Sequence, residues 1–239
     1  MFIVQNISKK YKHHVALAPM SFEADSGDCV VLCGGNGAGK STLIDMLSGI
    51  SIPSSGTVSF NELSLEKNRK EYLSQISYMP DDFFAQGHLK VKEFLSFYGS
   101  LRKIPANRID EVLSIVGLLE KKNIKVNQLS KGMRQRLLFG QALLPEAKVI
   151  LLDEPTNGLD PYWINQFVQI MKKLKEQGTI IIFSTHMMDV AAELGDRIIF
   201  LESGKVVKEL ENPHDNVQEF TFKLLTMYRE MKGGPNTVS

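Results

Sequence analysis

A glycine-rich segment between a strand-like stretch and a helix-like stretch constrains this chain more than any other part of its sequence. Residues 34–42 read GGNGAGKST and fit the pattern G-x-x-x-x-G-K-[ST], with the apolar run Cys29–Cys33 before them. Glycines let backbone N–H groups approach a phosphate closely, and the helix expected from about Lys40 to Ser48 presents its positive end to the same anion. The segment therefore predicts a phosphate-binding loop. Its residues are Gly34, Gly35, Asn36, Gly37, Ala38, Gly39, Lys40, Ser41 and Thr42.

A second apolar stretch ends in two adjacent carboxylates. Val149–Leu152 is strand-like, and Asp153 and Glu154 follow it directly. Because ligands bind beyond the carboxyl ends of parallel strands, both acids are expected to face the phosphate site. There Lys40 is expected to reach the β- and γ-phosphates of a nucleotide, and Ser41 to supply a hydroxyl to Mg²⁺. Asp153 is expected to hold Mg²⁺ as well, and Glu154 to orient or deprotonate the attacking water.

The order of the predicted elements indicates an α/β fold with a parallel or mixed sheet. The first 60 residues read mostly as an N-terminal antiparallel β part, with strands expected at residues 2–7, 17–23, 29–34 and 57–60. From residue 149 on, strands and helices alternate, which implies a parallel sheet flanked by helices. These later strands are residues 149–153, 179–184 and 197–202, with helices at residues 162–176 and 188–194.

Between these two parts lies a stretch in which apolar residues recur at helical spacing. It predicts helices near residues 91–101, 109–116 and 131–144, which would form an inserted α-helical lobe. The chain is therefore expected to divide into three parts. These are a nucleotide-binding core with the β part at residues 1–82 and 145–212, the helical lobe at residues 83–144, and a C-terminal helix and tail at residues 213–239.

Composition excludes several classes of protein. The formal net charge of +1 over 239 residues gives no overall attraction to nucleic acid, so we expect no nucleic-acid partner. No stretch approaches the roughly 18 apolar residues of a membrane span, and Met1–Lys10 lacks the apolar region of a secretory signal. The expected location is therefore cytosolic. Cys29 and Cys33, four residues apart on one expected strand, are too far apart for a disulfide and are expected in the core.

The segment Leu129–Arg136, which reads LSKGMRQR, resembles the signature of the ATP-binding-cassette (ABC) family, usually written LSGGQ followed by basic residues. Lys131 replaces the first glycine and Met133 the glutamine. Ser130 and Gly132, the positions that face the γ-phosphate in the family, are retained. Ser130 is also a good N-cap for the predicted helix at 131–144, and the two roles are compatible because a capped helix end is itself an anion site.

Other motifs extend this resemblance over almost the whole chain. Gly158-Leu159-Asp160 resembles the D-loop of the family, and His186, after a predicted strand, matches its switch histidine. Tyr11 matches the aromatic residue that stacks on adenine, although a tyrosine at a β edge can also serve ordinary packing. In the Q-loop the family usually has Tyr-x-Pro-Gln, whereas here Asp81 takes the place of the glutamine. A carboxylate can still coordinate Mg²⁺, so Asp81 joins Ser41 and Asp153 as a candidate metal ligand.

The resemblance implies an ATPase with a P-loop NTPase core that binds ATP and Mg²⁺. It implies a head-to-tail dimer, formed with a second copy or a related chain, in which Ser130 and Gly132 of one chain cover the ATP of the other. It also implies separate transmembrane permease subunits at the cytoplasmic face of the cell membrane. The acidic Q-loop, the Lys-Gly signature and the short chain resemble the ATPases of ABC-2 exporters. The adjacent residues Phe83 and Phe84 are expected either to receive the permease or to pack inside the helical lobe.

Two other readings of the sequence remain open. A soluble ABC ATPase that acts on DNA or ribosomes usually carries long coiled-coil insertions or two fused cassettes, and the sequence has neither. A regulator without catalysis is disfavoured because Glu154 and His186 are both present.

Overall fold

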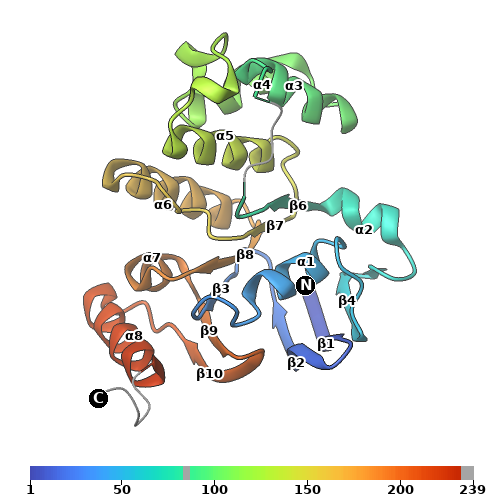
Figure 1. Ribbon diagram of the computed structural model, residues 1–239, viewed down its shortest axis with the longest axis vertical. Coiled ribbons are helices and arrows are strands. Elements are labelled where there is room, and N and C mark those ends of the chain that lie inside the picture. The colour runs from blue at the N-terminus through green and yellow to red at the C-terminus, as the bar shows by residue number, and fades with distance from the viewer. Residues whose placement is uncertain (83–86, 233–239) are drawn as a thin grey trace.

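The computed structural model describes residues 1–82 and 87–232. In this part of the chain, six strands form a central sheet in the order β10-β9-β3-β8-β7-β6 (Figure 1). The strands are β3 (Cys29–Cys33), β6 (Ile76–Met79), β7 (Val149–Leu152), β8 (Ile180–Thr185), β9 (Arg197–Glu202) and β10 (Lys205–Glu211). The strands β6, β7, β8, β3 and β9 are parallel to one another. The last strand, β10, pairs with β9 in the antiparallel direction. The mixed sheet and the α/β fold expected from the sequence are confirmed.

The central strand β3 explains why this sheet is covered by helices on both faces. All five of its residues are buried. The odd-numbered ones pack on the side of α6 (Pro161–Glu176) and α7 (Met188–Leu194). The even-numbered ones pack on the side of α1 (Lys40–Leu47). Alternate residues of a strand face opposite sides, so a strand covered on both faces needs an unbroken apolar run. Cys29 and Cys33 are buried free thiols, which confirms them as core residues.

A separate antiparallel sheet forms the N-terminal β part, as predicted. Its order is β2-β1-β4-β5, and it shares a hydrophobic core with α1. The strands are β1 (Phe2–Tyr11), β2 (His14–Ala24), β4 (Ser55–Phe60) and β5 (Leu63–Ser64). The short helix α2 (Arg69–Gln75) closes this core through the buried Tyr72, whose hydroxyl donates to the carbonyl oxygen of Leu47 at 2.7 Å.

The expected helical lobe lies at one end of the molecule, beyond β6 (Figure 1). It contains α3 (Val91–Leu101), α4 (Ala106–Ile115) and α5 (Lys131–Leu143), close to the predicted bounds. A Cβ at Gly140 of α5 would lie 3.3 Å from Val112, so the two helices approach closely there. The apolar residues of the lobe join one continuous hydrophobic cluster with those of α6 and α7, so its treatment as a separate domain remains a prediction.

The last helix of the chain, α8 (Val217–Lys232), packs on α7 near the carboxyl edge of the sheet (Figure 1). Phe220 and Leu224 are its buried anchors. In residues 1–82 and 87–232, no helix has the length and the apolar character that crossing a membrane requires.

Among the elements that were not predicted, three have a clear physical reason. The helix α2 has only seven residues, too few for a clear helical period. The strand β6 contains Ser77, a polar residue that is buried because its hydroxyl donates to the carbonyl oxygen of Ala142 at 2.6 Å. The strand β10 is exposed along almost its whole length, so it lacks the apolar alternation of a half-buried strand.

Candidate functional site

Loops that follow four parallel strands meet at one edge of the central sheet. The phosphate loop follows β3, Asp153 and Glu154 follow β7, His186 follows β8, and Asp81 comes two residues after β6. The N–H of Asp153 donates to the carbonyl oxygen of Met79 at 2.9 Å, which draws the ends of β7 and β6 together. Candidate residues far apart in the sequence are thus gathered at the edge where a parallel sheet binds ligands.

Glycines shape the phosphate loop at positions where a side chain would not fit. Gly39, the residue before α1, has a φ of 104°, in the left-handed region that favours glycine. A Cβ at Gly34 would lie 2.3 Å from the carbonyl oxygen of Leu201. No side chain caps the start of α1, so its first backbone N–H groups have no side-chain acceptor. Close backbone approach and a free helix start are the features that suit a phosphate ligand.

The ammonium of Lys40 lies between the phosphate loop and the acidic residues. Its Nζ donates to the carbonyl oxygens of Gly34 at 2.8 Å and Gly35 at 3.3 Å, and it lies 3.2 Å from Oε1 of Glu154. The side chain is only 7% exposed, and a buried charge of this kind needs such partners. Phosphate oxygens bound in the loop would compete with Glu154 for the same ammonium.

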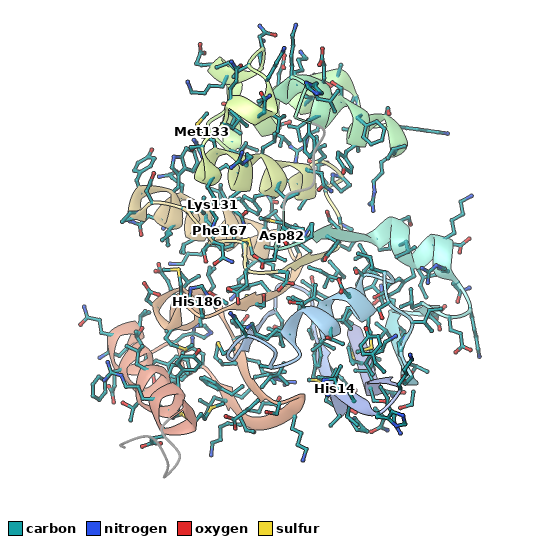
Figure 2. The ribbon with its side chains drawn as sticks, in the orientation of Figure 1. His14, Asp82, Lys131, Met133, Phe167 and His186 are labelled. Carbon is teal, nitrogen blue, oxygen red and sulfur yellow. The ribbon has the colours of Figure 1, made fainter. Side chains whose placement is uncertain are left out.

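The second carboxylate oxygen of Glu154 is held from the other side. Oε2 lies 2.9 Å from Nδ1 of His186, whose side chain is 57% exposed (labelled in Figure 2). The carboxylate of Glu154 therefore lies between a buried ammonium and an exposed imidazole. This arrangement places a base beside a group that can donate a proton or a hydrogen bond.

Two hydroxyl groups hold the carboxylate of Asp153. The Oγ of Ser184 donates to Oδ1 at 2.5 Å, and the hydroxyl of Ser41 is hydrogen-bonded to the same carboxylate. Burial raises the pKa of Asp153 above its ordinary value, the two hydrogen bonds oppose the rise, and the charges of Asp81 and Glu154 add to it. A carboxylate beside a hydroxyl supplies the oxygen ligands that Mg²⁺ prefers, so these residues fit the ion.

The backbone of Glu154 is fixed by its neighbours. Its φ of 45° is unusual for a residue other than glycine. Its N–H donates to Oγ of Ser184 at 2.7 Å, and its carbonyl oxygen accepts both from Nε2 of Gln135 and from the N–H of Asn157, each at 3.1 Å. Gln135 is a buried residue of α5. The helix that begins at the signature is thus connected directly to the residue expected to activate water.

Asp81 contacts the loop that follows Glu154. Its Oδ1 accepts a hydrogen bond from Nδ2 of Asn157 at 2.8 Å. In the described residues, no three His, Cys, Asp or Glu side chains converge on a common point as metal ligands. A Mg²⁺ held by Ser41 and Asp153 would therefore need phosphate or water oxygens to complete its ligands. The predicted contact of Asp81 with the metal remains a prediction.

The signature segment is shaped by its packing on the D-loop. Ser130 caps α5, since its Oγ accepts from the N–H of Met133 at 3.2 Å, as predicted. A Cβ at Gly132 would lie 2.7 Å from the carbonyl oxygen of Gly158, which explains the glycine. Lys131 lies over Gly158 with its aliphatic carbons. Figure 2 shows Lys131 and Met133 near the start of α5, on the lobe, apart from His186 on the core.

Two other candidates occupy positions with a clear structural role. Asp160 is the N-cap of α6, and its Oδ1 accepts from the N–H of Trp163 at 2.9 Å. Tyr11 lies at the end of β1, 51% exposed, with Nζ of Lys9 4.9 Å from the centre of its ring. Neither is in the group that surrounds Glu154 in the described structure, so their predicted roles toward nucleotide remain predictions.

Sequence reasoning missed three residues that hold Glu154 and Asp153 in place. Ser184 contacts both acids, Asn157 links Glu154 to Asp81, and Gln135 donates to Glu154 from α5. The role of Ser184 could have been predicted, because β8 lies beside β7 and a polar residue near its carboxyl end lies at the same edge of the sheet. The sequence points less strongly to Gln135. A glutamine on the buried face of a helix needs a polar partner, but the sequence does not say which one.

The sequence of this chain is similar to those of known ABC transporter proteins. The profile of the family described as "ABC transporter" matches residues 17–157. The uncharacterized ABC transporter ATP-binding protein YxlF of Bacillus subtilis is 35% identical over 210 residues, which cover 86% of this chain and 69% of that protein. Nod factor export ATP-binding protein I of Rhizobium etli is 31% identical over 218 residues, which cover 90% of this chain and 69% of that protein.

Solved structures agree with the fold. The dimeric ABC cassette MJ0796, in a post-hydrolysis state bound to ADP and Pi, superposes with a TM-score of 0.79 at 29% identity. The match covers 88% of this chain and 98% of that one. Profile, relatives and structure therefore identify the chain as a member of the ABC transporter family: it is an ATP-binding subunit, and it is an ATPase.

Proposed function

We propose that this chain hydrolyses ATP beside Glu154 and thereby drives an exporter whose membrane-spanning part lies on other chains. The observation that best supports this proposal is the position of the Glu154 carboxylate, 3.2 Å from Nζ of Lys40 and 2.9 Å from Nδ1 of His186. A phosphate-binding cation, a base and an imidazole are thus adjacent. Phosphoryl transfer requires positioning and charge neutralisation more than covalent chemistry, and these groups provide both.

In this proposal the loop Gly34–Thr42 holds the phosphates of ATP. The γ-phosphate takes the place of Glu154 at the ammonium of Lys40, which frees a carboxylate oxygen of Glu154 to orient or deprotonate the attacking water. His186, exposed beside Glu154, hydrogen-bonds to the γ-phosphate. Ser41 and Asp153 would hold Mg²⁺, which when bound neutralises charge on the phosphates.

We also propose that a second copy of this chain, or a related chain, completes each ATP site. Ser130 is exposed at the start of α5, on the lobe and away from Lys40 in the core, so it is available to another chain. Gly132, two residues further on, packs on Gly158 of the D-loop, whose last residue is Asp160. In a head-to-tail dimer two such sites enclose two ATP molecules, and loss of the γ-phosphate lets the chains separate. The dimeric cassette that this chain resembles supports the arrangement.

The proposed docking site for the transmembrane subunits is the junction of the lobe and the core. A groove of about 180 Å³ lies there between β6, α3 and the end of α5, with Tyr78, Tyr98 and Leu101 among its lining residues. On α3, Phe97 is 55% and Leu101 is 66% exposed, four residues apart on one helix face. An exposed apolar pair beside a groove is suited to receive a helix from a partner. The expected pair Phe83 and Phe84 lies outside the described residues.

Replacing Phe97 or Leu101 by serine, each separately, is expected to weaken association of the chain with its transmembrane subunits. Either change removes one exposed apolar contact, so co-purification from membrane extracts should fall by about tenfold if the residue is a central anchor. Thermal melts and basal ATPase activity should stay close to those of the unmodified chain, because both side chains are exposed.

The matched control is Phe222→Ser on α8, where the phenylalanine is 70% exposed and far along the chain from the groove. It should co-purify normally. If both α3 variants also co-purify normally while the extract contains the transmembrane subunits, the docking site lies elsewhere. Equal losses in the α3 variants and the control would indicate a general surface effect instead of a docking site.

Asp81→Asn is expected to raise the Mg²⁺ concentration for half-maximal ATPase activity by about twofold to fivefold, because it removes one negative charge close to Asp153. The affinity for ATP should change less. Asn157→Ala is the control, since it removes the hydrogen bond to Asp81 and keeps the carboxylate. An unchanged Mg²⁺ dependence, combined with loss of stimulation by the transmembrane subunits, would make Asp81 a coupling residue instead of a metal ligand.

We assign the proposed transporter to the ABC-2 exporters, at the cytoplasmic face of the membrane. The acidic Q-loop at Asp81, the Lys131-Gly132 signature and the similarity to a Nod factor export protein support this choice. A soluble ABC ATPase remains the second candidate, and the co-purification experiment separates the two. The three-part division at residues 1–82 with 145–212, 83–144 and 213–239 is part of the same proposal.

A further inference from the structure

A small cavity lies between the phosphate loop and the C-terminal helix. Its volume is about 210 Å³. One wall is the phosphate loop itself, and a second is the turn between β9 and β10. The third wall is made by two side chains of α8, Tyr228 and Met231. The loop residues that line the cavity are Gly35, Asn36, Gly37 and Ala38. The second wall contains Leu201 and Glu202 at the end of β9 and Ser203 of the turn. The last part of the chain therefore lies beside the loop that the proposed function assigns to the phosphates of ATP.

The turn between β9 and β10 fixes the back of the phosphate loop. The N–H of Gly204 donates to the carbonyl oxygen of Ala38 at 3.1 Å, and the N–H of Ala18 donates to the carbonyl oxygen of Gly204 at 2.6 Å. The close approach of Gly34 to Leu201 adds a contact with no room for a side chain. This wall of the cavity is therefore set by the backbone.

The wall made by α8 is set by side chains, and α8 is itself held on α7. Phe220 is 3% exposed and Leu224 is fully buried, both in the cluster that contains α7. Met231 is one helical turn beyond Tyr228, so the two side chains share a face of α8. The helix α7 begins two residues after His186, so α8 packs on the helix that follows the proposed γ-phosphate contact.

We propose that Tyr228 and Met231 are positioning residues for the phosphate loop, so that the C-terminal helix sets the affinity of this chain for ATP. The inference rests on the proposed assignment of the ATP phosphates to Gly34–Thr42. Two partly buried side chains of α8 line the same cavity as four residues of the phosphate loop. A charge introduced on this wall would lie in the same cavity of about 210 Å³ as the phosphate loop, so it would act on the bound phosphates by Coulomb's law.

Met231→Glu, Met231→Lys and Met231→Gln test the proposal by the sign of their effects. Calorimetric titration with ATP should give a dissociation constant about threefold to tenfold higher for the Glu variant and lower by a similar factor for the Lys variant, because ATP is strongly anionic. The Gln variant loses the same apolar contacts without gaining a charge. Its dissociation constant for ATP should lie between those of the Glu and Lys variants. The dissociation constants for ADP should follow the same order among the three variants. They should differ less from one another, because ADP carries less negative charge than ATP.

The matched controls are Phe222→Glu and Phe222→Lys, which place the same charges at an exposed position of α8 outside the cavity. They should leave the affinity for ATP within about twofold of the unmodified chain, since exposed charges in salt are screened. If the two Met231 charge variants shift the affinity in the same direction, or not at all, Met231 only packs against the fold and the inference is wrong.

Lys40→Ala separates this inference from the proposed function. If Lys40→Ala weakens ATP binding and the Met231 charge variants do not differ, the phosphate loop is assigned correctly and only the role of α8 fails. If Lys40→Ala leaves ATP binding unchanged, the phosphates bind elsewhere, and the role of α8 fails together with the assignment.

Discussion

Replacement of Glu154 by glutamine is expected to lower steady-state ATP hydrolysis by about a hundredfold or more, while ATP still binds. The glutamine keeps the size of the side chain but cannot accept a proton from water. It also removes the negative partner of Lys40, which leaves that ammonium free for phosphate. ATP-bound dimers should accumulate, because the γ-phosphate that bridges the two chains in the proposed site is not removed.

Phosphate release measures the loss of hydrolysis, and size-exclusion chromatography with ATP measures the dimers. Glu146→Gln is the control, because Glu146 is 73% exposed and Arg108 keeps its closer ion pair with Glu111 at 2.6 Å. It should hydrolyse ATP normally. A Glu154→Gln chain that turns over ATP within about threefold of the unmodified rate would show that another group activates the water.

Lys40→Ala is expected to raise the dissociation constant for ATP by about tenfold to a hundredfold, the usual effect of losing hydrogen bonds between a cation and a phosphate. Lys40 also neutralises Glu154 in the fold, so a thermal melt must accompany the titration. Lys172→Ala, which removes an exposed lysine of α6 that pairs with Glu193, should bind ATP normally. Normal ATP binding by a folded Lys40→Ala chain would contradict the assignment of the phosphate loop.

The sequence predicted the central strands and the phosphate loop because each has a strong local cause. The run Cys29–Cys33 is apolar at every position, as a strand covered on both faces requires, and residues 34–42 after it fit the full phosphate-loop pattern. The same reasoning failed for β6 and β10. The buried polarity of Ser77 is satisfied by a residue 65 positions away, and β10 is a solvent-exposed edge strand. Both depend on contacts that a local pattern does not contain.

For the candidate site, the sequence predicted that Asp153, Glu154 and His186 lie at one edge of the sheet with the phosphate loop, but not how they are held. The positions of Asp153, Glu154 and His186 after parallel strands were enough to place them at one edge. The left-handed backbone of Glu154 and its contacts with Gln135 and Ser184 were beyond prediction, because they join parts of the chain 19 and 30 residues apart. Such contacts are decided by packing.

In the proposed dimer two chains together make one working ATP site, and Ser130→Arg disables the half of the site that the second chain contributes. A large cation at the exposed start of α5 should block the approach of another chain's phosphates and abolish hydrolysis, while the phosphate loop of the same chain still binds ATP. Ser130→Thr keeps the capping hydroxyl and should retain most activity.

The most direct measurement is the ATPase activity of an equal mixture of Lys40→Ala and Ser130→Arg chains, carrying different affinity tags so that mixed dimers can be isolated. Each variant alone should be inactive. A mixed dimer contains one site with an intact loop and an intact signature, so the mixture should recover about a quarter of the unmodified activity if each site works independently. Isolated mixed dimers that bind ATP and hydrolyse none of it would contradict a site shared between two chains.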